Sequence, residues 1–205
     1  VAPSMLVVGT NVGYPPFIMS DDAGEIVGFD ADVAEELARR LKRTVVFKDM
    51  AFEALILSLN QGSVDMIIGG LSITNERKKS GMLLPYYGMG IDEVSVFSAR
   101  AITPPATLAD LAAARFSVCT QSGTLFEELV EKYEGITVKS LSDIAEIVLE
   151  VEHRRSDVGL LDSDTVRVLG AFHPALHVYT IPLLPAERID GYGIGIAPAN
   201  EALRR

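Results

Sequence analysis

The chain has 205 residues, 48% of them hydrophobic, so it can bury one large core or two smaller ones. Its formal net charge is −10, shared equally between residues 1–97 and 98–205, so neither half has the basic surface that nucleic-acid binding requires. No apolar run approaches the roughly 20 residues of a membrane span. Residues 1–4 are not a basic stretch followed by an apolar one, so a signal peptide either never existed or has been removed.

Cysteine and histidine give no sign of a disulfide framework, a metal or a catalytic nucleophile. The single cysteine, Cys119, lies in an expected strand without a basic neighbour, so we interpret it as buried and inert. His153, His173 and His177 show no metal-ligand spacing and are expected to be structural or exposed. We therefore predict no cofactor, no metal site and no catalytic residue.

The first half alternates expected strands and helices, as in an α/β fold. Residues 10–17 follow the first strand and contain Pro15 and Pro16 side by side, which predicts a rigid loop. Tyr14 in this loop is either a core residue or a flat wall for a ligand. Asp30 is expected to cap the next helix. The expected strands span 5–9, 44–48 and 66–68, and the expected helices span 31–42 and 52–60.

Residues 69–77 combine features of an anion receptor. Two glycines end an apolar strand and leave backbone groups open to an approaching molecule. Ser72 and Thr74 supply hydroxyls, and Thr74 is expected to cap a short helix over 75–80. Arg77 adds a positively charged guanidinium group in the first turn of this helix. The stretch predicts a carboxylate-binding site, and the alternative is an ordinary strand–turn–helix junction with a surface arginine.

The second half repeats the alternation. A proline-containing turn is expected at 84–88, and two prolines within 101–106 mark a candidate boundary. A polar glycine turn at 121–124 follows a strand, as the glycines at 69–70 do, so we expect two lobes with a ligand cleft between facing strand ends. The other expected strands span 92–98, 115–120, 137–139, 158–161, 177–181 and 191–197, and the other helices 108–114, 125–133, 144–152 and 165–172, with a further helix beginning near 198.

These motifs together resemble the bacterial periplasmic solute-binding proteins for polar amino acids, which feed ABC transporters. The resemblance implies a type II periplasmic-binding-protein fold. In this fold each of two α/β lobes is a mostly parallel sheet with flanking helices, and two crossover strands join lobes that close on the ligand. Lobe 1 would comprise residues 1–97 and 189–205, and lobe 2 residues 98–188. The matching segments keep the family's order and spacing over nearly the whole chain: Val8-Gly9-Thr10-Asn11, Tyr14-Pro15-Pro16-Phe17, Gly28-Phe29-Asp30, 65–77, Gln121-Ser122-Gly123-Thr124, 157–162 and 191–195.

The resemblance also implies roles for individual residues. Arg77 would hold the ligand α-carboxylate through a bidentate salt bridge, and Asp162 would accept from the α-ammonium group. Ser72, the backbone at Gly70 and the amides around Thr124 and Leu125 would add hydrogen bonds. The full expected set of ligand-binding residues is Asn11, Tyr14, Phe52, Glu53, Gly70, Leu71, Ser72, Arg77, Gln121, Thr124, Leu125 and Asp162.

The resemblance is closest to arginine-binding members of the family. Tyr14 and Phe52 would sandwich a guanidinium group, a contact worth roughly 1–2 kcal/mol when desolvated. Glu53 is the candidate acid for a cationic side chain. Asn11 stands where some binders of basic amino acids have aspartate, so lysine, ornithine, histidine and glutamine stay open as alternatives to arginine.

Family members continue through about two more helices that complete lobe 1, and the C-terminal part of this chain lacks them. Their absence would expose apolar surface on lobe 1 and promote self-association. The resemblance places the protein in the periplasm, or lipid-anchored on the outer face of the cytoplasmic membrane, with an ABC transporter permease as partner. It implies a binding protein and not an enzyme.

Two other functions on the same fold stay open. One is a ligand-binding sensor domain. The other is an enzyme resembling the cyclohexadienyl dehydratases, which would need a general acid such as Glu53 or Asp162.

Overall fold

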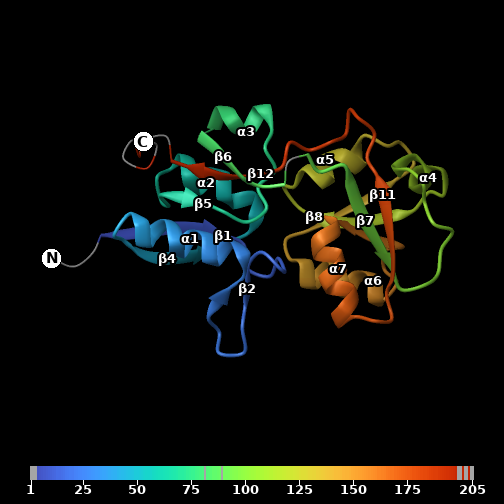
Figure 1. Cartoon of the computed structure of the whole chain (residues 1–205). Helices are drawn as coiled ribbons and strands as arrows, with labels where there is room; N and C mark the ends of the chain where they lie inside the picture. The colour runs from blue at the N-terminus through green and yellow to red at the C-terminus, as the bar shows by residue number, and fades with distance from the viewer. Residues whose placement is uncertain (1–3, 81, 89, 198–199, 201–202, 204–205) are drawn as a thin grey trace. The chain divides into compact units, whose positions relative to one another are not determined.

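The computed structural model describes residues 4–80, 82–88, 90–197, 200 and 203. It divides into two compact units (Figure 1): unit 1 comprises Val1–Met89 and Asp190–Arg205, and unit 2 comprises Gly90–Ile189. Each unit has its own five-stranded sheet, flanking helices and buried core, which confirms the predicted α/β class.

The chain passes from one unit to the other at residues 89–90 and 189–190, and it changes from one sheet to the other close to these two places. The lobe limits predicted at 97 and 98 and at 188 and 189 stay a prediction about the lobes. Residues 101–106, the candidate boundary, lie within unit 2. The helix expected to begin near residue 198 falls largely outside the described residues.

The sheet of unit 1 has the order β4-β1-β5-β12-β6. β1 runs parallel to β4 and β5, whereas β12 runs antiparallel to β5 and β6. In Figure 1 the red β12 lies beside β6, although more than 100 residues separate them in the chain. The strands are β1 (Met5–Thr10), β4 (Thr44–Asp49), β5 (Met66–Ile67), β6 (Met82–Tyr87) and β12 (Tyr192–Ile196), and a small hairpin pairs β2 (Met19–Ser20) with β3 (Ile26–Val27).

Helices cover both faces of this sheet because its central strands are apolar on both sides. Leu6 and Val8 lie in one core cluster with alanines of α1 (Phe29–Arg40). Ile67 lies in a second cluster with leucines of α2 (Leu55–Asn60), which the 3₁₀ turn η1 (Phe52–Ala54) precedes. Alternate residues of a strand point to opposite faces, so a continuous apolar run is what a strand buried on both sides needs.

α1 begins earlier than expected, and Asp30 is not its cap. Gly28 occupies the N-cap position with φ of 124°, and a Cβ there would lie 2.4 Å from the carbonyl oxygen of Phe17. Asp30 lies instead in the first turn, fully buried, and its backbone N–H donates to the Phe17 carbonyl at 2.7 Å. The prediction was wrong because the glycine conformation, and not a side-chain cap, starts the helix.

The prediction of a turn at 84–88 is also wrong, because residues 84–87 belong to strand β6. Pro85 pairs with Gly193 of β12 in an antiparallel ladder. β6 is the edge strand of its sheet, and an edge strand tolerates a residue without an N–H on its open side. The proline therefore marks a strand position here, and not a turn.

The sheet of unit 2 repeats the arrangement of unit 1. Its order is β11-β7-β10-β8-β9, with β8 parallel to β9 and β10, and β7 antiparallel to β10 and β11. Each sheet has five strands, of which four run in the same direction. The reversed strand is the fourth when the sheets are counted from β4 and from β9, that is, β12 in unit 1 and β7 in unit 2. The strands are β7 (Glu93–Ser98), β8 (Ser117–Gln121), β9 (Thr137–Leu141), β10 (Val158–Leu161) and β11 (His177–Pro182).

Side-chain caps start three of the helices of unit 2. Thr107 and Asp110 form a capping box at α4, Thr124 caps α5, and Asp162 caps α7. The helices are α4 (Leu108–Ala113), α5 (Leu125–Glu131), α6 (Ile144–Glu152) and α7 (Ser163–Phe172). No helix in the described part of the chain has both the length and the hydrophobicity needed to cross a membrane.

The cysteine and histidine interpretations are confirmed in unit 2. Cys119 is buried in β8, and burial raises the pKa of its thiol to about 11, so the nucleophilic thiolate is disfavoured at neutral pH. His153 and His177 are exposed, and His173 pairs with Glu152 at 2.8 Å.

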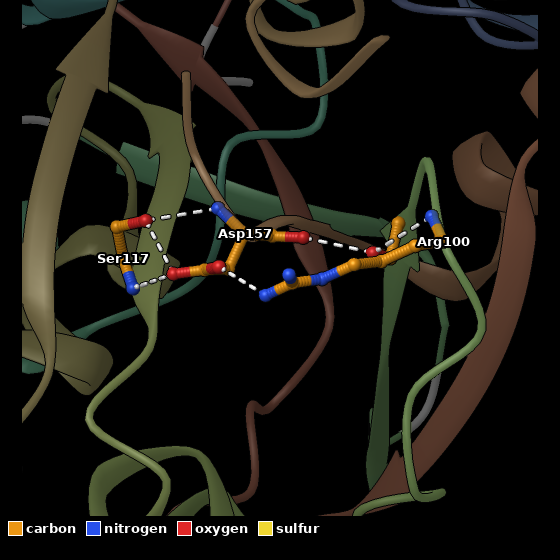
Figure 2. Close-up of polar contacts among 4 residues, drawn as sticks. Arg100, Ser117 and Asp157 are labelled. Carbon is orange, nitrogen blue, oxygen red and sulfur yellow. Dashed lines mark hydrogen bonds and ion pairs between the residues drawn. The ribbon is translucent and has the colours of Figure 1, made fainter. Parts of the chain in front are cut away.

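Asp157 connects three segments of unit 2 at the start of β10 (Figure 2). Its Oδ2 accepts from the backbone N–H and the hydroxyl of Ser117 at 2.9 and 2.8 Å, and its Oδ1 accepts from Arg100 Nη2 at 2.7 Å. The Ser98 hydroxyl donates to its carbonyl at 2.9 Å. Burial alone would raise the pKa of Asp157, but the hydrogen bonds from Ser117 and the charge of Arg100 hold it below its usual value.

We expect Asp157→Asn to lower the free energy of unfolding near neutral pH by about 1–3 kcal/mol, because hydrogen bonds to a charged group contribute about this much. The lowered pKa of the folded state means that the stabilisation is present above the unfolded-state pKa, about 3.9, and is lost as the pH falls. Urea unfolding at neutral and acidic pH measures this difference. Glu36→Gln, which removes an exposed partner of Arg39 and Arg40, is the control and should change stability little. An equal loss for Asp157→Asn at both pH values would contradict the prediction.

Candidate functional site

The predicted ligand-binding residues of unit 1 lie where β1 and β5 end. Asn11 directly follows β1, is buried, and its Nδ2 donates to the Met50 carbonyl at 2.9 Å. This bond fixes the side-chain amide against the loop that follows β4. In parallel sheets, side chains that follow neighbouring strands meet at one edge, which is where such folds bind ligands.

Tyr14 is held on several sides and only 8% exposed. Its ring stacks on Phe17, with 5.0 Å between centroids and 21° between planes, and its hydroxyl lies 3.2 Å from the Tyr192 hydroxyl. The ring also lies against Gly70. Tyr14 therefore has the packing of a core residue, and its use as a ligand wall stays a prediction.

Gly70 packs closely against the Tyr14 ring. Its φ is 65°, and a Cβ at this position would lie 2.3 Å from Tyr14 Cε1, so only glycine fits without displacing the ring. The Gly70 N–H donates to the Tyr86 hydroxyl over 3.4 Å, which is a long bond. The backbone is thus fixed from the strand side by Tyr86 and from the other side by Tyr14.

β12 holds the two residues that follow Gly70. The Leu71 carbonyl accepts from the Gly193 N–H at 2.8 Å, and Ser72 forms an antiparallel bridge with Tyr192. The Leu71 side chain lies in the core under α2, and Ser72 is buried. Residues 70–72, called the Gly70 loop below, are therefore rigidly supported.

Arg77 lies in α3 (Asn75–Ser80), and its side chain turns back to the Gly70 loop. Thr74 Oγ1 accepts from the Arg77 N–H at 3.1 Å, which confirms Thr74 as the cap. Arg77 Nη1 donates to the Ser72 carbonyl at 3.1 Å, and its Cζ lies 5.7 Å from the centre of the Phe52 ring. The guanidinium group is thereby oriented by a hydrogen bond and a cation–π contact.

Phe52 and Glu53 lie side by side in η1 but in different environments. Phe52 is buried in the core under α2, and Glu53 is exposed. The exposed carboxylate of Glu53 adds negative charge at the surface next to the Phe52 ring, which the Arg77 guanidinium contacts.

The predicted residues of unit 2 lie where β8 and β10 end. Gln121 ends β8, and its Nε2 donates to the Ser142 carbonyl at 2.9 Å. The Thr124 hydroxyl donates to the Gln121 carbonyl at 2.7 Å and accepts from the Glu127 N–H at 3.3 Å. Leu125 is the first residue of α5 and packs against the core.

Asp162 directly follows β10 and is almost completely buried. Its Oδ1 accepts from the Thr165 N–H at 2.9 Å, as the cap of α7. β10 and β8 are parallel neighbours, so Asp162 and Gln121 lie at the same edge of the sheet.

Three residues of this region were missed in the sequence. Tyr192 touches both Tyr14 and Ser72, and its only signals were the two flanking glycines and its place in the matching segment 191–195. Tyr86 bonds to Gly70 from the segment that we predicted as a turn. Asp30 is fully buried, and burial raises its pKa to about 7. Burial, and after it the charge of the Asp30 carboxylate, raises the pKa of the Tyr86 hydroxyl.

Comparisons with known proteins point in one direction. The family model described as bacterial extracellular solute-binding proteins, family 3, matches residues 6–136. The probable ABC transporter arginine-binding protein ArtJ of Chlamydia trachomatis is 36% identical, over 96% of this chain and 75% of that protein. The probable histidine-binding protein of Campylobacter jejuni is 31% identical, over 83% of this chain and 65% of that protein.

A similar chain of known structure is the arginine-bound form of truncated ArgBP from T. maritima. It is 36% identical in sequence to this chain, and the two superpose with a TM-score of 0.88. The match covers 98% of this chain and 91% of that chain.

We expect Gly70→Ala to destabilise unit 1 more than Gly62→Ala. Both glycines have a positive φ, 65° and 68°, so both substitutions strain the backbone equally. A Cβ at Gly62 meets no atom within 4 Å, whereas at Gly70 it must displace the Tyr14 ring. We expect the difference in free energy of unfolding to be about 1–3 kcal/mol, the usual range for overpacking. Urea unfolding measures it, and equal losses for the two variants would disprove the tight contact.

Proposed function

Since the chain belongs to the bacterial extracellular solute-binding proteins of family 3, we propose that it binds a free α-amino acid, arginine first, for an ABC transporter. The family description places this activity outside the cytoplasm. The periplasm, or a lipid anchor on the outer face of the cytoplasmic membrane, is the proposed location. The transporter's permease is the proposed protein partner.

The observation that carries the proposal is the fixed guanidinium of Arg77 beside the Gly70 loop. A guanidinium has five N–H donors in one plane, and a carboxylate accepts two of them in parallel. The bond to the Ser72 carbonyl and the contact with Phe52 hold the plane of the Arg77 guanidinium in one orientation. Such preorganisation reduces the entropy lost on binding.

Unit 1 would therefore recognise the α-carboxylate that all amino acids share. Arg77 provides the charge, and Ser72 and the backbone at Gly70 and Leu71 provide hydrogen bonds. The Gly70 loop is rigid because Tyr14, Tyr86 and β12 hold it. Its donors and acceptors would thus lose little freedom when a ligand binds.

Unit 2 would contribute the contacts to the α-ammonium group. Asp162 is buried at the end of β10 as the cap of α7, and a buried carboxylate favours a cationic partner. Gln121, Thr124 and Leu125 would add contacts from the end of β8 and the start of α5.

Arginine is the preferred ligand because of the relatives and the aromatic residues. ArtJ and ArgBP are named for arginine. Phe17 covers one face of the Tyr14 ring and Arg77 lies over one face of Phe52, so a ligand guanidinium would use the opposite faces. Asn11 and Glu53 would complete the side-chain pocket. The histidine-binding relative is the reason to test histidine alongside arginine, lysine, ornithine and glutamine.

The sensor and the dehydratase are weaker alternatives. The arginine-binding relative and the histidine-binding relative are both named as binding proteins, which supports binding without chemistry. Asp162 already serves as the cap of α7, and Glu53 is exposed on the surface of unit 1, so a binding role accounts for both residues without a general acid.

Calorimetric titration with the twenty amino acids and ornithine tests the proposal. We expect arginine to bind with micromolar or higher affinity and Arg77→Ala to bind no amino acid measurably. Loss of one partner of a buried ion pair costs about 3–5 kcal/mol, which is more than a hundredfold in affinity. Arg39→Ala removes an arginine that only pairs with Glu36 on the surface, so it is the control and should bind normally. Absence of heat from every amino acid with the unmodified protein would overturn the proposed function.

We expect Glu53→Gln to weaken the binding of arginine, lysine and ornithine and to leave glutamine binding unchanged. The loss should be about two- to fivefold, because Glu53 is exposed and exposed ion pairs contribute about 0.2–1 kcal/mol. The same calorimetric titration, made with arginine and glutamine in parallel, measures it. An equal loss for both ligands would remove Glu53 from the choice of side chain.

A further inference from the structure

A buried carboxyl group lies directly behind the Gly70 loop and has no role in the proposed contacts. Asp30 is fully buried, and among the described residues neither of its oxygens makes a hydrogen bond of ordinary geometry. The polar groups that act on it are the Tyr86 hydroxyl and the Gly70 amide. A buried carboxyl without firm partners is costly, so its position calls for an explanation.

Asp30 is connected to the ligand-facing backbone by a short chain of groups. The Tyr86 hydroxyl interacts with Asp30, and it also accepts from the Gly70 N–H over 3.4 Å. On its other side Gly70 meets the ring of Tyr14, whose hydroxyl bonds to Tyr192. A change at Asp30 therefore acts on Gly70 through Tyr86, while Tyr14 prevents Gly70 from moving away freely.

Among the described residues, the titratable group that acts directly on Asp30 is the Tyr86 phenol. Tyr86 comes from β6, and Tyr192 from β12 acts in turn on Tyr86. The Tyr14 hydroxyl lies 3.2 Å from the Tyr192 hydroxyl, so Tyr14 is connected to Asp30 only through Tyr192 and Tyr86. On α1 itself the neighbouring acid, Asp32, is exposed. No basic side chain in the described part of the chain is among the groups that act on Asp30, and burial raises its pKa to about 7.

We propose that Asp30 is a positioning residue of the amino-acid site, and that its proton controls how well the Gly70 loop receives a carboxylate. When protonated, Asp30 is neutral and its O–H can donate to the Tyr86 hydroxyl. When it loses the proton, a negative charge appears behind the loop. This charge attracts the Gly70 N–H inward and repels a ligand carboxylate on the other side of the loop.

This inference rests on the proposed function, because the ligand must present a carboxylate to the Gly70 loop. Affinity should then be highest where Asp30 is protonated and should fall as the pH rises through neutrality. By linkage, binding near pH 7 takes up a proton from solvent onto an Asp30 oxygen. Variation of the heat of binding with the ionisation enthalpy of the buffer reports this uptake.

Calorimetric titration of arginine from about pH 6 to about pH 8 tests the coupling. We expect the affinity of the unmodified protein to fall about fivefold, the lower end of typical coupling between two sites. Asp30→Asn keeps the shape of the neutral acid, so it should bind with the low-pH affinity throughout. Asp32→Asn, two residues away on the exposed face of α1, is the matched control and should follow the unmodified protein. Binding by the unmodified protein and Asp30→Asn with the same pH profile would overturn the inference while leaving the proposed function intact.

A ligand-free measurement keeps the inference testable if no amino acid binds or if Asp30→Asn does not fold. In the unmodified protein, NMR should show the Gly70 amide resonance moving with the titration of the Asp30 side-chain carbon near pH 7. Tyr86→Phe, which removes the connecting hydroxyl, should reduce the movement of the Gly70 resonance. A Gly70 resonance that does not change while Asp30 titrates would overturn the inference, whatever the ligand experiments show.

The raised pKa of Asp30 also predicts the sign of a stability effect. The folded state holds the Asp30 proton more tightly than the unfolded state, whose aspartate pKa is about 3.9, so stability falls as the pH rises from about 4 through about 7. Thermal unfolding of the ligand-free protein should show this fall, and Asp30→Asn should remove it. An identical pH dependence for both proteins would show that Asp30 does not titrate as the inference requires.

Discussion

The close contact between the Tyr14 ring and Gly70 is the constraint on which the rest of the candidate site depends. The ring occupies the space that a Cβ of residue 70 would need, and the left-handed backbone of Gly70 turns the chain toward Ser72. Ser72 in turn presents the carbonyl that orients Arg77. A contact between two residues 56 positions apart thus helps to orient the guanidinium group of the candidate site.

In unit 2, too, residues proposed to contact the ligand have a second role in stabilising the fold. Thr124 and Asp162 each start a helix, and Gln121 ties β8 to the residue that follows β9. Their side chains are therefore held by bonds within unit 2. The repeated sheet order in the two units explains why both sets occur at equivalent places, after the first and third strands of each parallel set.

Much of this arrangement could be predicted from the sequence, and the family resemblance is confirmed by the comparisons. Local signals were sufficient for Thr74, whose hydroxyl caps α3, and for the apolar run of β1, which is buried on both faces. They failed where a distant partner decides the outcome. Pro85 is tolerated because β12 pairs with only one side of β6, and Asp30 is displaced from the cap by the contact of Gly28 with Phe17. The neighbours of Asp30 come from three other segments of the chain, so no local sequence pattern predicts that its side chain is buried.

The position of β12 has a consequence for the order in which the protein folds. β12 lies between β5 and β6 and supplies Ile194 and Ile196 to the core under α1, yet it is formed by residues 192–196. Unit 2 is one continuous segment, so a ribosome releases all of it before unit 1 has its fourth strand. During synthesis β6 has no partner in the sheet until the chain returns, and its unpaired edge is then open to other chains. Unit 2 is thus able to complete its fold first, and β12 then joins the sheet of the unit that was begun first.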